Sequence, residues 1–569
     1  MNNKVYLKKD NHWLAFQNPH QIISTKNINE VREALQNVEA LVNEKKWHAV
    51  GFVSYEAAQA FDSALQVFES TNFPLIWFGL YENPTSLKNL AGLSGLINQS
   101  WKPDIDKETY NNAIQKIKDY IANGKTYQVN YTMRLLSDVQ PDSFSLFTHL
   151  AQTQNKYAAF IETDDFAICC ASPELFFDLD GDVITSKPMK GTIKRGRTTD
   201  EDLINSEWLR TSEKNRAENV MIVDMIRNDL GKIAQRGSVH VPELFAIEKY
   251  STLFQMTSTV KAKTNASVAK IFSALFPCAS ITGAPKVSTM KIINELETSP
   301  RKIYTGSIGY IFPNRQARFN VAIRTALIDK KNKTAEYGVG GGIVWDSEDK
   351  DEFEEALLKA RVLTNPPQPD FSLFETMLWT KDEGYFLLDK HIARLKDSAE
   401  YFDFVFSEEK VANQLSVISD QLSVARVKII LDKNGNLTSE VKDFDLHEKV
   451  FKVCLANESV NSNDVFLFHK TTHREVYENL FQKKYDDVLL FNEKDELTEY
   501  TIGNLVIEQN GELFTPPVSC GLLAGTFREH LLETGKIEEK IIHKYELSSV
   551  SKIYLINSVR KWVEVELKM

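Results

Sequence analysis

The sequence predicts a protein of the mixed α+β class that consists of two globular pieces. Of its 569 residues, 43% are apolar and 25% are charged, which is ordinary for a globular protein with a core of normal size. Segments with the spacing of amphipathic helices occur together with strand-like apolar segments. Three prolines stand within residues 366–369, where they stop the preceding helix and favour an extended linker.

This proline-rich stretch predicts the domain boundary. We expect a first domain at residues 1–364, a linker at residues 365–370 and a second domain at residues 371–569. The second domain restarts with the strand-like sequence FSLFETMLW, followed by Gly384 and YFLLD. Both pieces are long enough to form a hydrophobic core of their own.

Charge and cysteine content exclude several classes of protein. The net charge of −11 argues against a nucleic-acid-binding surface, which needs a basic stripe. The five cysteines are odd in number and irregularly spaced, which favours a reduced compartment over a disulfide framework. The N-terminus lacks the apolar core of a signal peptide, and no apolar run is long enough to span a membrane. We therefore expect a cytoplasmic protein that binds neither nucleic acid nor membranes.

A helix is predicted at residues 212–232, in the sequence SEKNRAENVMIVDMIRNDLGK. Ser212 can cap its start, and Gly231 stands near its end. Apolar residues at positions 222, 226 and 230 form a stripe, and Glu218 lies on the same line one turn earlier. A carboxylate in that position is costly to bury unless it is paired or binds a cation.

A second helix is predicted at residues 350–363. One face carries apolar residues, whereas Glu352, Glu355 and Lys359 share another face. The glycine-rich sequence YGVGGGIVW precedes this helix, and backbone N–H groups at such a run can approach an anion closely. Each feature also has a simpler interpretation, because Glu355 and Lys359 can form an ion pair on the helix surface and the glycines can mark a bend in a sheet.

Three further side chains are candidates for chemistry, although each is ambiguous by itself. Lys190 lies in the turn-like sequence PMKGT, where a solvated lysine is the more common finding. Glu174 lies in SPELF, where it resembles an ordinary surface carboxylate. Arg324 lies in an apolar strand-like segment, where a buried structural ion pair is the simple explanation.

The joint occurrence of these motifs is much more specific than any one of them. The ordered set is YQVN (127–130), SPELF (172–176), PMKGT (188–192), AENVMIVD (217–224), RNDL (227–230), SITGAPK (280–286), GSIGY (306–310) and GGGIV (340–344). It resembles the chorismate-utilising enzymes, and in particular aminodeoxychorismate synthase component I. This resemblance implies an antiparallel β-sandwich with flanking helices.

The resemblance also implies roles for individual residues. Glu218 and Glu355 would be the carboxylate ligands of Mg²⁺. Lys190 would attack C2 of chorismate, and Glu174 would act as general acid and base at C4. The matching position of Lys190 is typically alanine in anthranilate synthases. The chorismate-binding residues implied by the resemblance are Gly191, Thr192, Tyr304, Arg324, Gly340, Gly341, Gly342 and Lys359.

One residue departs from the family pattern, and the sequence contains no motif for a glutaminase nucleophile. Many relatives have a histidine where this chain has Gln255, and glutamine cannot exchange a proton near neutral pH. No cysteine stands in a Gly-x-Cys-x-Gly context suited to a glutaminase nucleophile. We therefore expect ammonia to come from a separate glutamine amidotransferase.

The second domain contains another ordered set of motifs, each of which could be an ordinary surface feature by itself. The set is HIARL (391–395), KTTHR (470–474), LTEY (497–500), GNL (503–505), TPP (515–517) and GTFR (525–528). It resembles the class IV pyridoxal-phosphate enzymes, which include aminotransferases and aminodeoxychorismate lyase, and it implies a two-layer α/β domain. The usual N-terminal strand looks trimmed, because the domain begins close to Phe374.

The cofactor chemistry of that family assigns five residues. Lys470 would bond the pyridoxal phosphate, and Glu499 would face its pyridinium nitrogen. Arg394, Gly525 and Thr526 would hold the phosphate. The KTTHR sequence favours the lyase over the aminotransferases, which often place a tyrosine where this chain has Glu475.

Taken together, the sequence predicts a bifunctional enzyme of p-aminobenzoate synthesis that requires Mg²⁺ and pyridoxal phosphate. Chorismate and ammonia would give 4-amino-4-deoxychorismate, and loss of pyruvate would then give p-aminobenzoate for folate. Two alternatives remain open. One is an anthranilate or isochorismate synthase fused to a class IV aminotransferase. The other is a catalytically inactive protein that binds chorismate or a partner subunit.

Overall fold

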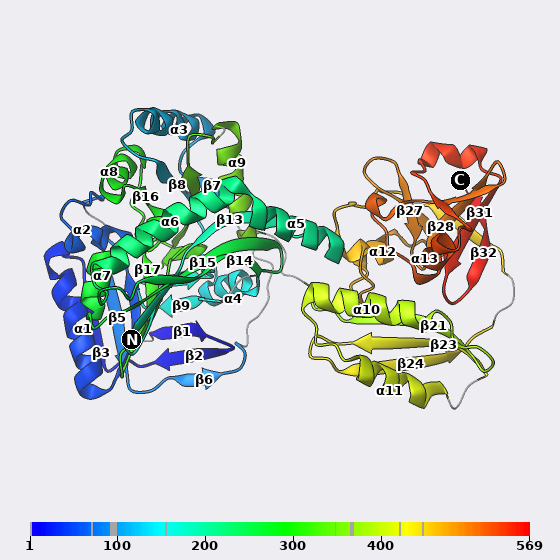
Figure 1. Cartoon of the computed structure of the whole chain (residues 1–569), viewed down its shortest axis with the longest axis horizontal. Coiled ribbons are helices and arrows are strands. Elements are labelled where there is room, and N and C mark those ends of the chain that lie inside the picture. The colour runs from blue at the N-terminus through cyan, green and yellow to red at the C-terminus, as the bar shows by residue number, and fades with distance from the viewer. Residues whose placement is uncertain are drawn as a thin grey trace. The chain divides into compact units, whose positions relative to one another are not determined.

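The computed structural model describes residues 3–69, 72–90, 100–153, 156–347, 349–364, 369–419, 423–445 and 449–568. The chain forms two compact units (Figure 1). The first unit comprises Met1–Lys194 and Ser206–Gln368, and the second comprises Arg195–Asn205 and Pro369–Met569. Of the predicted linker, residues 365–368 lie outside the described residues. No helix in the described ranges is long and apolar enough to cross a membrane.

The first unit contains two ten-stranded sheets in which all neighbouring strands are antiparallel. One sheet has the order β16 (Gly283–Ala284), β8 (Gln128–Ser137), β20 (Thr334–Ile343), β19 (Thr325–Asp329), β10 (Phe166–Cys170), β9 (Ala159–Glu162), β1 (Lys4–Lys9), β2 (His12–Gln17) and β6 (Thr85–Leu87), with β7 (Lys102–Pro103) beside β8. The other has the order β13 (Met189–Lys194), β15 (Leu253–Lys263), β12 (Val183–Lys187), β11 (Leu175–Asp180), β18 (Gln316–Asn320), β17 (Ser307–Phe312), β4 (His48–Val53), β5 (Ile76–Tyr81) and β3 (Gln21–Thr25), with β14 (His240–Lys249) beside β15.

The two sheets share one apolar core. Val5 and Ile161 of the first sheet belong to the same buried cluster as Phe52, Trp77 and Ile308 of the second sheet. Strands with apolar residues on both faces require cover on their other side as well. That cover comes from helices on each outer face, so the predicted combination of sheets and helices is confirmed.

The helices divide between the two outer faces. Helices α3 (Lys107–Ala122), α4 (Ser143–Thr153), α8 (Lys286–Leu296) and α9 (Asp349–Ala360) share a core with the sheet that contains β8 and β20. Helices α1 (Val31–Lys45), α2 (Ala58–Phe61), α6 (Glu213–Gly231) and α7 (Val268–Leu275) share a core with the sheet that contains β11 and β4. Helix α5 (Thr199–Thr211) begins in the second unit and ends in the first.

The two helices predicted from the sequence are present with slightly different ends. The side chain of Ser212 caps α6 by accepting a hydrogen bond from the N–H of Asn215. The predicted apolar stripe, Ile222, Ile226 and Leu230, is buried. The helix predicted at residues 350–363 is α9, which ends at Ala360 and continues as a short 3-10 turn at Arg361–Leu363.

One part of the second unit is a four-stranded antiparallel sheet covered by two helices. Its order is β22 (Gly384–Tyr385), β21 (Leu373–Thr380), β23 (Val424–Leu431) and β24 (Leu437–Asp443), and its helices are α10 (Leu388–Phe402) and α11 (Glu408–Ser419). Leu395 and Ala399 of α10 pack with Met377 and Val427 of the sheet. Of the strand-like sequence YFLLD, only Tyr385 lies in a strand, β22, and α10 begins at Leu388.

The other part of the second unit is an eight-stranded mixed sheet. Its order is β27 (Leu497–Tyr500), β26 (Asp487–Phe491), β25 (Phe451–Leu455), β32 (Lys561–Lys568), β31 (Lys552–Asn557), β28 (Asn504–Gln509), β29 (Glu512–Thr515) and β30 (Glu538–Glu539). Strand β27 also pairs with β28, so six of the strands close a ring. Helices α12 (Glu475–Leu480) and α13 (Thr526–Glu533) accompany this sheet.

Candidate functional site

Lys190 lies on β13 among charged groups from three other segments. Burial lowers its pKa from the ordinary value, while the carboxylates of Glu218 and Glu174 oppose that shift and the ammonium of Lys359 adds to it. Its Nζ also lies 3.3 Å from the position that a Cβ on Gly342 would occupy. The structure therefore brings together side chains that are far apart in the sequence around one buried amine.

Glu174 is buried in the loop that precedes β11, with 4% of its surface exposed. This overturns the interpretation of Glu174 as a surface carboxylate. Its Oε1 accepts a 2.6 Å hydrogen bond from the hydroxyl of Ser280. Burial raises the pKa of Glu174 to about 7, against the lowering effects of Ser280 and the charge of Lys190. A carboxyl group with such a pKa can both give and take a proton near neutral pH.

The predicted glycine run lies inside β20 and pairs with β8 as far as Ile343. Gly340 is required there because a Cβ would come within 2.2 Å of the backbone oxygen of Tyr131, whereas a Cβ on Gly342 would displace the end of the Gln128 side chain, whose Nε2 lies 2.2 Å away. On its other side, the pairing of β20 with β19 extends only to Tyr337. A Cβ on Gly341 would meet only the side-chain ends of Glu352 and Lys359, at 3.3 and 3.4 Å.

Charged side chains of α9 lie beside the glycine strand. Glu355 is 55% exposed and forms a 2.8 Å ion pair with Lys359, as the simpler interpretation expected. Lys359 Nζ also donates a 3.1 Å hydrogen bond to Gly340 O. Burial and the nearby charge of Glu355 raise the pKa of Glu352, whereas Ser347, Lys359 and Lys214 lower it.

These acids fit a magnesium site that substrate completes. In the described part of the chain, no three His, Cys, Asp or Glu side chains are grouped closely enough to hold a metal by themselves. Mg²⁺ usually takes one or two carboxylates together with waters and substrate oxygens. The neighbouring acids on α9 repel each other, which a bound cation would relieve, and Glu218 approaches Lys190 from α6.

The remaining predicted substrate residues lie around the same strands. Gly191 follows Lys190 with a φ of +93°, and a Cβ there would lie 3.0 Å from Asn215 Oδ1 of α6. Thr192 is exposed and pairs across the sheet with Gln255. The ring of Tyr304 covers Gly338, whose Cβ would come within 2.1 Å of it.

Arg324 differs from its expected setting. It lies just before β19 rather than inside a strand, and it has a left-handed φ of +51°. Burial lowers its pKa, and the structure places Tyr337 and Tyr250 close by. Among the described residues, no carboxylate forms an ion pair with Arg324, so the expected structural ion pair is absent from that part of the chain.

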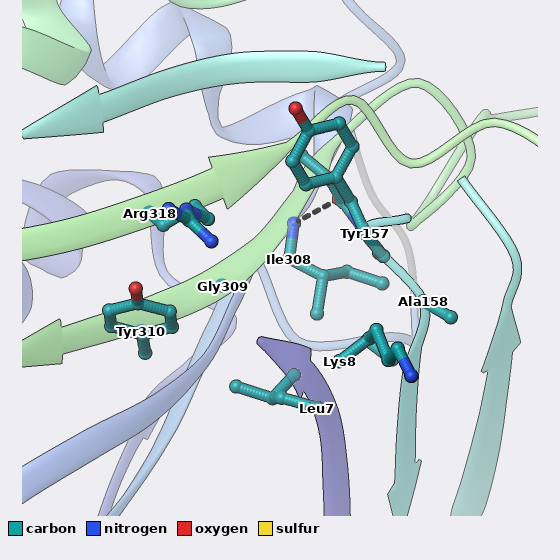
Figure 2. A pocket seen from close by; sticks show the side chains of 10 residues that line it. Leu7, Lys8, Tyr157, Ala158, Ile308, Gly309, Tyr310 and Arg318 are labelled. Carbon is teal, nitrogen blue, oxygen red and sulfur yellow. Dashed lines mark hydrogen bonds between the residues drawn. The ribbon is translucent and has the colours of Figure 1, made fainter. Parts of the chain in front are cut away.

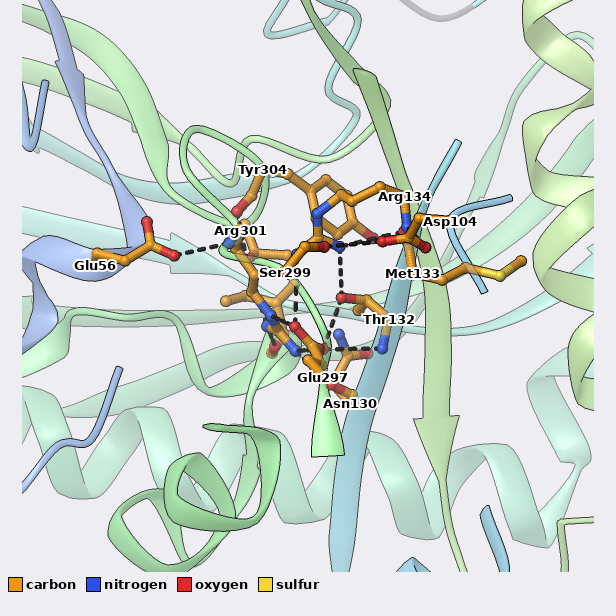
Figure 3. A network of polar contacts seen from close by, with 12 residues as sticks. Glu56, Asp104, Asn130, Thr132, Met133, Arg134, Glu297, Ser299, Arg301 and Tyr304 are labelled. Atoms are coloured by element: carbon orange, nitrogen blue, oxygen red, sulfur yellow. Dashed lines mark hydrogen bonds and ion pairs between the residues drawn. The ribbon is translucent and has the colours of Figure 1, made fainter. Parts of the chain in front are cut away.

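A buried network of ion pairs and hydrogen bonds joins Glu297 and Arg301 to Thr132 and Arg134 of β8 (Figure 3). Glu297 accepts hydrogen bonds from Arg301 Nη2 at 2.7 Å and from the Thr132 hydroxyl at 2.7 Å. Arg134 pairs with the same carboxylate at 3.5 Å, and all three charged side chains are at most 2% exposed. Because a buried charge must be paired, this network fixes β8 and therefore the glycine strand beside it.

A small hollow in the first unit is lined by residues other than those of the candidate site around Lys190 (Figure 2). It is lined by Leu7, Lys8, Tyr157, Ala158, Ala159, Ile308, Gly309, Tyr310, Arg318 and Asn320, which come from β1, β9, β17, β18 and the loop before β9. None of the predicted catalytic or substrate-binding residues belongs to this lining.

Lys470 is the centre of a second site, in the second unit. Burial and the positive charges of Arg394 and Arg474 lower its pKa to about 8, against the opposing carboxylates of Glu375 and Glu499. Its Nζ lies 5.0 Å from the centre of the Phe374 ring. An amine with this pKa is partly neutral near pH 8 and can act as a nucleophile or a base.

Glu499 is buried without a basic partner in direct contact among the described residues. Its Oε1 accepts hydrogen bonds from the Tyr477 hydroxyl at 2.8 Å and from the Leu523 N–H at 3.2 Å. Its Oε2 accepts one from Asn504 Nδ2 at 3.3 Å. Burial raises the pKa of Glu499 to about 7. A cationic N–H group beside this carboxyl group would lower the pKa and stabilise the charged form.

Arg394 is held by an acid that the sequence did not reveal. Glu375 accepts two 2.8 Å hydrogen bonds from Arg394 and one 2.7 Å hydrogen bond from His391 Nδ1. Although burial opposes it, the Arg394 charge and the hydrogen bonds from His391 and Arg394 hold the pKa of Glu375 well below its ordinary value. Since Nδ1 donates, Nε2 of His391 accepts from the Thr526 hydroxyl at 3.2 Å.

These residues fit pyridoxal phosphate. Thr526 is the first residue of α13, where free N–H groups favour a phosphate. A Cβ on Gly525 would lie 2.0 Å from Asn504 Oδ1, so it would displace Asn504 from its hydrogen bonds to Glu499 and Leu523 O. Lys470, a buried acid and a helix N-terminus together supply the three groups that this cofactor needs. Glu375, His391 and Tyr477 extend the set found from the sequence.

Comparison with known proteins finds two family matches, one on each side of the proline-rich stretch. Residues 94–365 match the chorismate binding enzymes, and residues 372–567 match the class IV amino-transferases. The probable chloroplastic aminodeoxychorismate synthase of Oryza sativa subsp. japonica is 41% identical over 285 residues, which are 48% of this chain and 32% of that protein. Aminodeoxychorismate synthase component 1 of Bacillus subtilis (strain 168) is 40% identical over 282 residues, which are 48% of this chain and 60% of that protein. The chain thus spans less than two thirds of these relatives.

A solved structure shares the fold of the first unit. Anthranilate synthase component I from Streptococcus pneumoniae TIGR4 is 22% identical and has a TM-score of 0.53, with 64% of this chain and 92% of that chain covered. At this identity the likeness concerns the fold alone.

Proposed function

We propose that this chain, which carries a chorismate binding enzyme domain at residues 94–365 and a class IV amino-transferase domain at residues 372–567, makes p-aminobenzoate in two steps. The first unit converts chorismate and ammonia to 4-amino-4-deoxychorismate. The second unit releases pyruvate from that product. The observation that carries this proposal is the position of Lys190, whose lowered pKa favours the neutral amine beside Glu174.

Lys190 and Glu174 share the first reaction. Neutral Lys190 Nζ attacks C2 of chorismate, while Glu174, with a pKa of about 7, gives its proton to the leaving C4 hydroxyl. Glu174 then takes a proton as ammonia adds at C4 and Lys190 leaves C2. Arg324, Tyr304, Gly191, Thr192, Lys359 and the amides of residues 340–342 bind the substrate carboxylates and orient the ring.

Glu218 and Glu355 hold Mg²⁺, and Glu352 lies beside Glu355 on α9. When bound, this cation anchors and neutralises a substrate carboxylate. The chain takes its ammonia from a separate glutamine amidotransferase, because its five cysteines are all buried and none stands in a nucleophile context.

Lys470 performs the proton transfer of the second reaction. Pyridoxal phosphate, when bound, stores the electron pair that is released at the substrate. Lys470 would bond the cofactor aldehyde and, once released, would take the C4 proton of the substrate, for which its pKa of about 8 is suited. Glu499 would hold the pyridinium nitrogen. Arg394, Gly525 and Thr526 would hold the phosphate.

The test is incubation of the chain with chorismate, ammonium, Mg²⁺ and pyridoxal phosphate, followed by chromatographic identification of the product. We expect p-aminobenzoate and pyruvate in equal amounts. Anthranilate or isochorismate as the main product would instead support a different chorismate enzyme fused to an aminotransferase. Absence of chorismate consumption, together with binding of chorismate, would indicate an inactive binding protein.

A further inference from the structure

A short segment of the first half of the sequence is built into the second unit. Residues Arg195–Asn205 directly follow β13, the strand that carries Lys190, yet they belong to the same compact unit as Pro369–Met569. The family match of residues 94–365 includes this segment. The second unit is therefore assembled from two stretches of chain that are far apart in the sequence.

The segment has an internal structure that fixes its shape. Arg195 Nε donates a 2.6 Å hydrogen bond to Asp202 Oδ2, and the N–H of Gly196 donates a 2.7 Å hydrogen bond to Asp202 Oδ1. Arg195 and Asp202 are both buried. A Cβ on Gly196 would come within 2.3 Å of Glu201 Cβ, so the turn closes too tightly for any side chain.

Helix α10 and the residues before Lys470 bind this turn. The Tyr401 hydroxyl donates a 2.6 Å hydrogen bond to Gly196 O, and the Arg195 guanidinium covers the Tyr401 ring at 4.2 Å. Arg195 Nη2 donates to Tyr401 O at 3.0 Å. The Arg197 guanidinium donates to Ser462 O at 3.1 Å and lies 4.8 Å from the centre of the Phe468 ring.

His469 links the segment to the lysine of the second site. Its Nε2 is 3.1 Å from Arg197 O, and because a carbonyl oxygen only accepts, this nitrogen carries the proton. Its Nδ1 therefore accepts from the Ser398 hydroxyl at 2.9 Å. Burial lowers the pKa of His469 to about 4, which keeps the ring neutral. Lys470 is the next residue, and Arg394 lies one turn before Ser398 on α10.

We propose that residues 195–202 are a positioning element of the second site, which orients Lys470 through His469 and Arg394 through α10. The cofactor-binding geometry of the second unit thus depends on a turn that extends from the Lys190 strand. This goes beyond the proposed reactions, because the docking of the segment does not require that either reaction occurs.

Hydrogen–deuterium exchange on the full-length chain tests the docking without catalysis. We expect slow exchange in peptides that cover residues 195–205, and several-fold faster exchange there and at 466–473 in Tyr401→Phe, which loses only the hydroxyl bound to Gly196. Tyr385→Phe is the matched control, because its hydroxyl donates to Leu415 O at 2.9 Å within the same unit. Unprotected exchange of residues 195–205 in the wild-type chain would overturn the proposal.

Cofactor affinity tests the positioning role. His469→Gln keeps an N–H donor for Arg197 O, whereas His469→Leu has none. We expect the dissociation constant for pyridoxal phosphate, followed by visible absorbance, to rise at least several-fold in His469→Leu and in Tyr401→Phe, and to return close to the wild-type value in His469→Gln. Equal affinities in the leucine and glutamine variants, or in Tyr401→Phe and Tyr385→Phe, would show that the segment does not position the site.

Discussion

Ser280 donates a 2.6 Å hydrogen bond to Glu174, and this bond opposes the effect of burial on the carboxyl group. Ser280 lies in the SITGAPK motif and Glu174 in the SPELF motif, more than a hundred residues apart. The contact explains why the two motifs occur together. The SPELF motif places the acid, and the SITGAPK motif supplies the hydrogen bond that lowers its pKa.

Ser280→Ala should therefore change the pH dependence of the first reaction. Loss of the hydrogen bond raises the pKa of Glu174 above about 7, so the protonated form that serves the leaving hydroxyl persists to higher pH. We expect the alkaline limb of kcat/KM for chorismate to move to higher pH, with several-fold slower turnover. The profile should be measured at constant free ammonia. An unshifted limb would mean that Glu174 is not the titrating acid.

Lys190→Ala should reduce aminodeoxychorismate formation by orders of magnitude, because it removes the proposed nucleophile. Removal of its ammonium should also raise the pKa of Glu174 further, since that charge lowers it. Elimination of pyruvate from supplied aminodeoxychorismate should be unchanged. Lys331→Ala, which removes an exposed lysine paired with Asp165 at 2.9 Å, is the control. Near-wild-type synthesis by Lys190→Ala would exclude the covalent mechanism.

Glu218→Gln and Glu355→Gln should each raise the Mg²⁺ concentration needed for half-maximal synthesis, because each removes one charged ligand. The Glu355 variant also frees Lys359, its 2.8 Å partner, so its chorismate KM should change more than that of the Glu218 variant. A titration of activity with Mg²⁺ measures both effects. Full activity of the wild-type chain in excess EDTA would contradict the metal assignment.

Glu375→Gln should destabilise the second unit, because it leaves Arg394 without its buried carboxylate. Breaking a buried ion pair costs about 3–5 kcal/mol, whereas Glu440→Gln, at a surface pair 3.9 Å from Lys428, should cost less than about 1 kcal/mol. The folded pKa of Glu375 is depressed. Its contribution is therefore complete above the unfolded pKa of about 4.3 and declines as the pH falls below it.

Urea unfolding of the full chain between pH 3 and pH 7, followed at the tryptophans of the second unit, measures this contribution. The wild-type and Glu375→Gln curves should converge toward acid pH. A constant difference between them would show that the pKa of Glu375 is the same in the folded and unfolded states.

Lys470→Ala should separate the two reactions. It loses both the group that bonds the cofactor and the proposed base, while Lys190 and the magnesium carboxylates remain. We expect continued consumption of chorismate and ammonia, accumulation of aminodeoxychorismate, and recovery of p-aminobenzoate when an independent lyase is added. Normal p-aminobenzoate production by this variant would show that the second unit does not catalyse the release of pyruvate. Loss of chorismate consumption would show that the two sites are coupled.

The sequence predicts those parts of the fold that local chemistry determines. The cap at Ser212 and the stripe that ends at Leu230 are enough to place α6, and the glycines and acids near α9 point to one site. Burial of Glu174 could not be predicted, because it depends on Ser280 and on strands far away in the sequence. Arg324 was expected within a strand, but its left-handed backbone is set by the connection between β18 and β19.

The residues that the sequence did not identify act through contacts between distant segments. In the sequence, Glu375 looks like an ordinary polar residue of a strand. Its contact with Arg394 is evident only in the structure, where α10 packs against that strand. Segment 195–205 carries no compositional signal for its membership of the second unit. Its partners are a tyrosine and a histidine more than two hundred residues later.

The closed ring of strands in the second unit has a consequence for biosynthesis. Strand β32, at Lys561–Lys568, lies between β25 and β31, so the ring stays open until that strand has left the ribosome. Domains made earlier usually fold first, and the first unit, including β13, can do so long before. The partners of residues 195–202 in the second unit are translated after the first unit. Premature stop codons before β32 should therefore leave the first unit folded, residues 195–202 without their packed partners, and the rest of the second unit prone to aggregation.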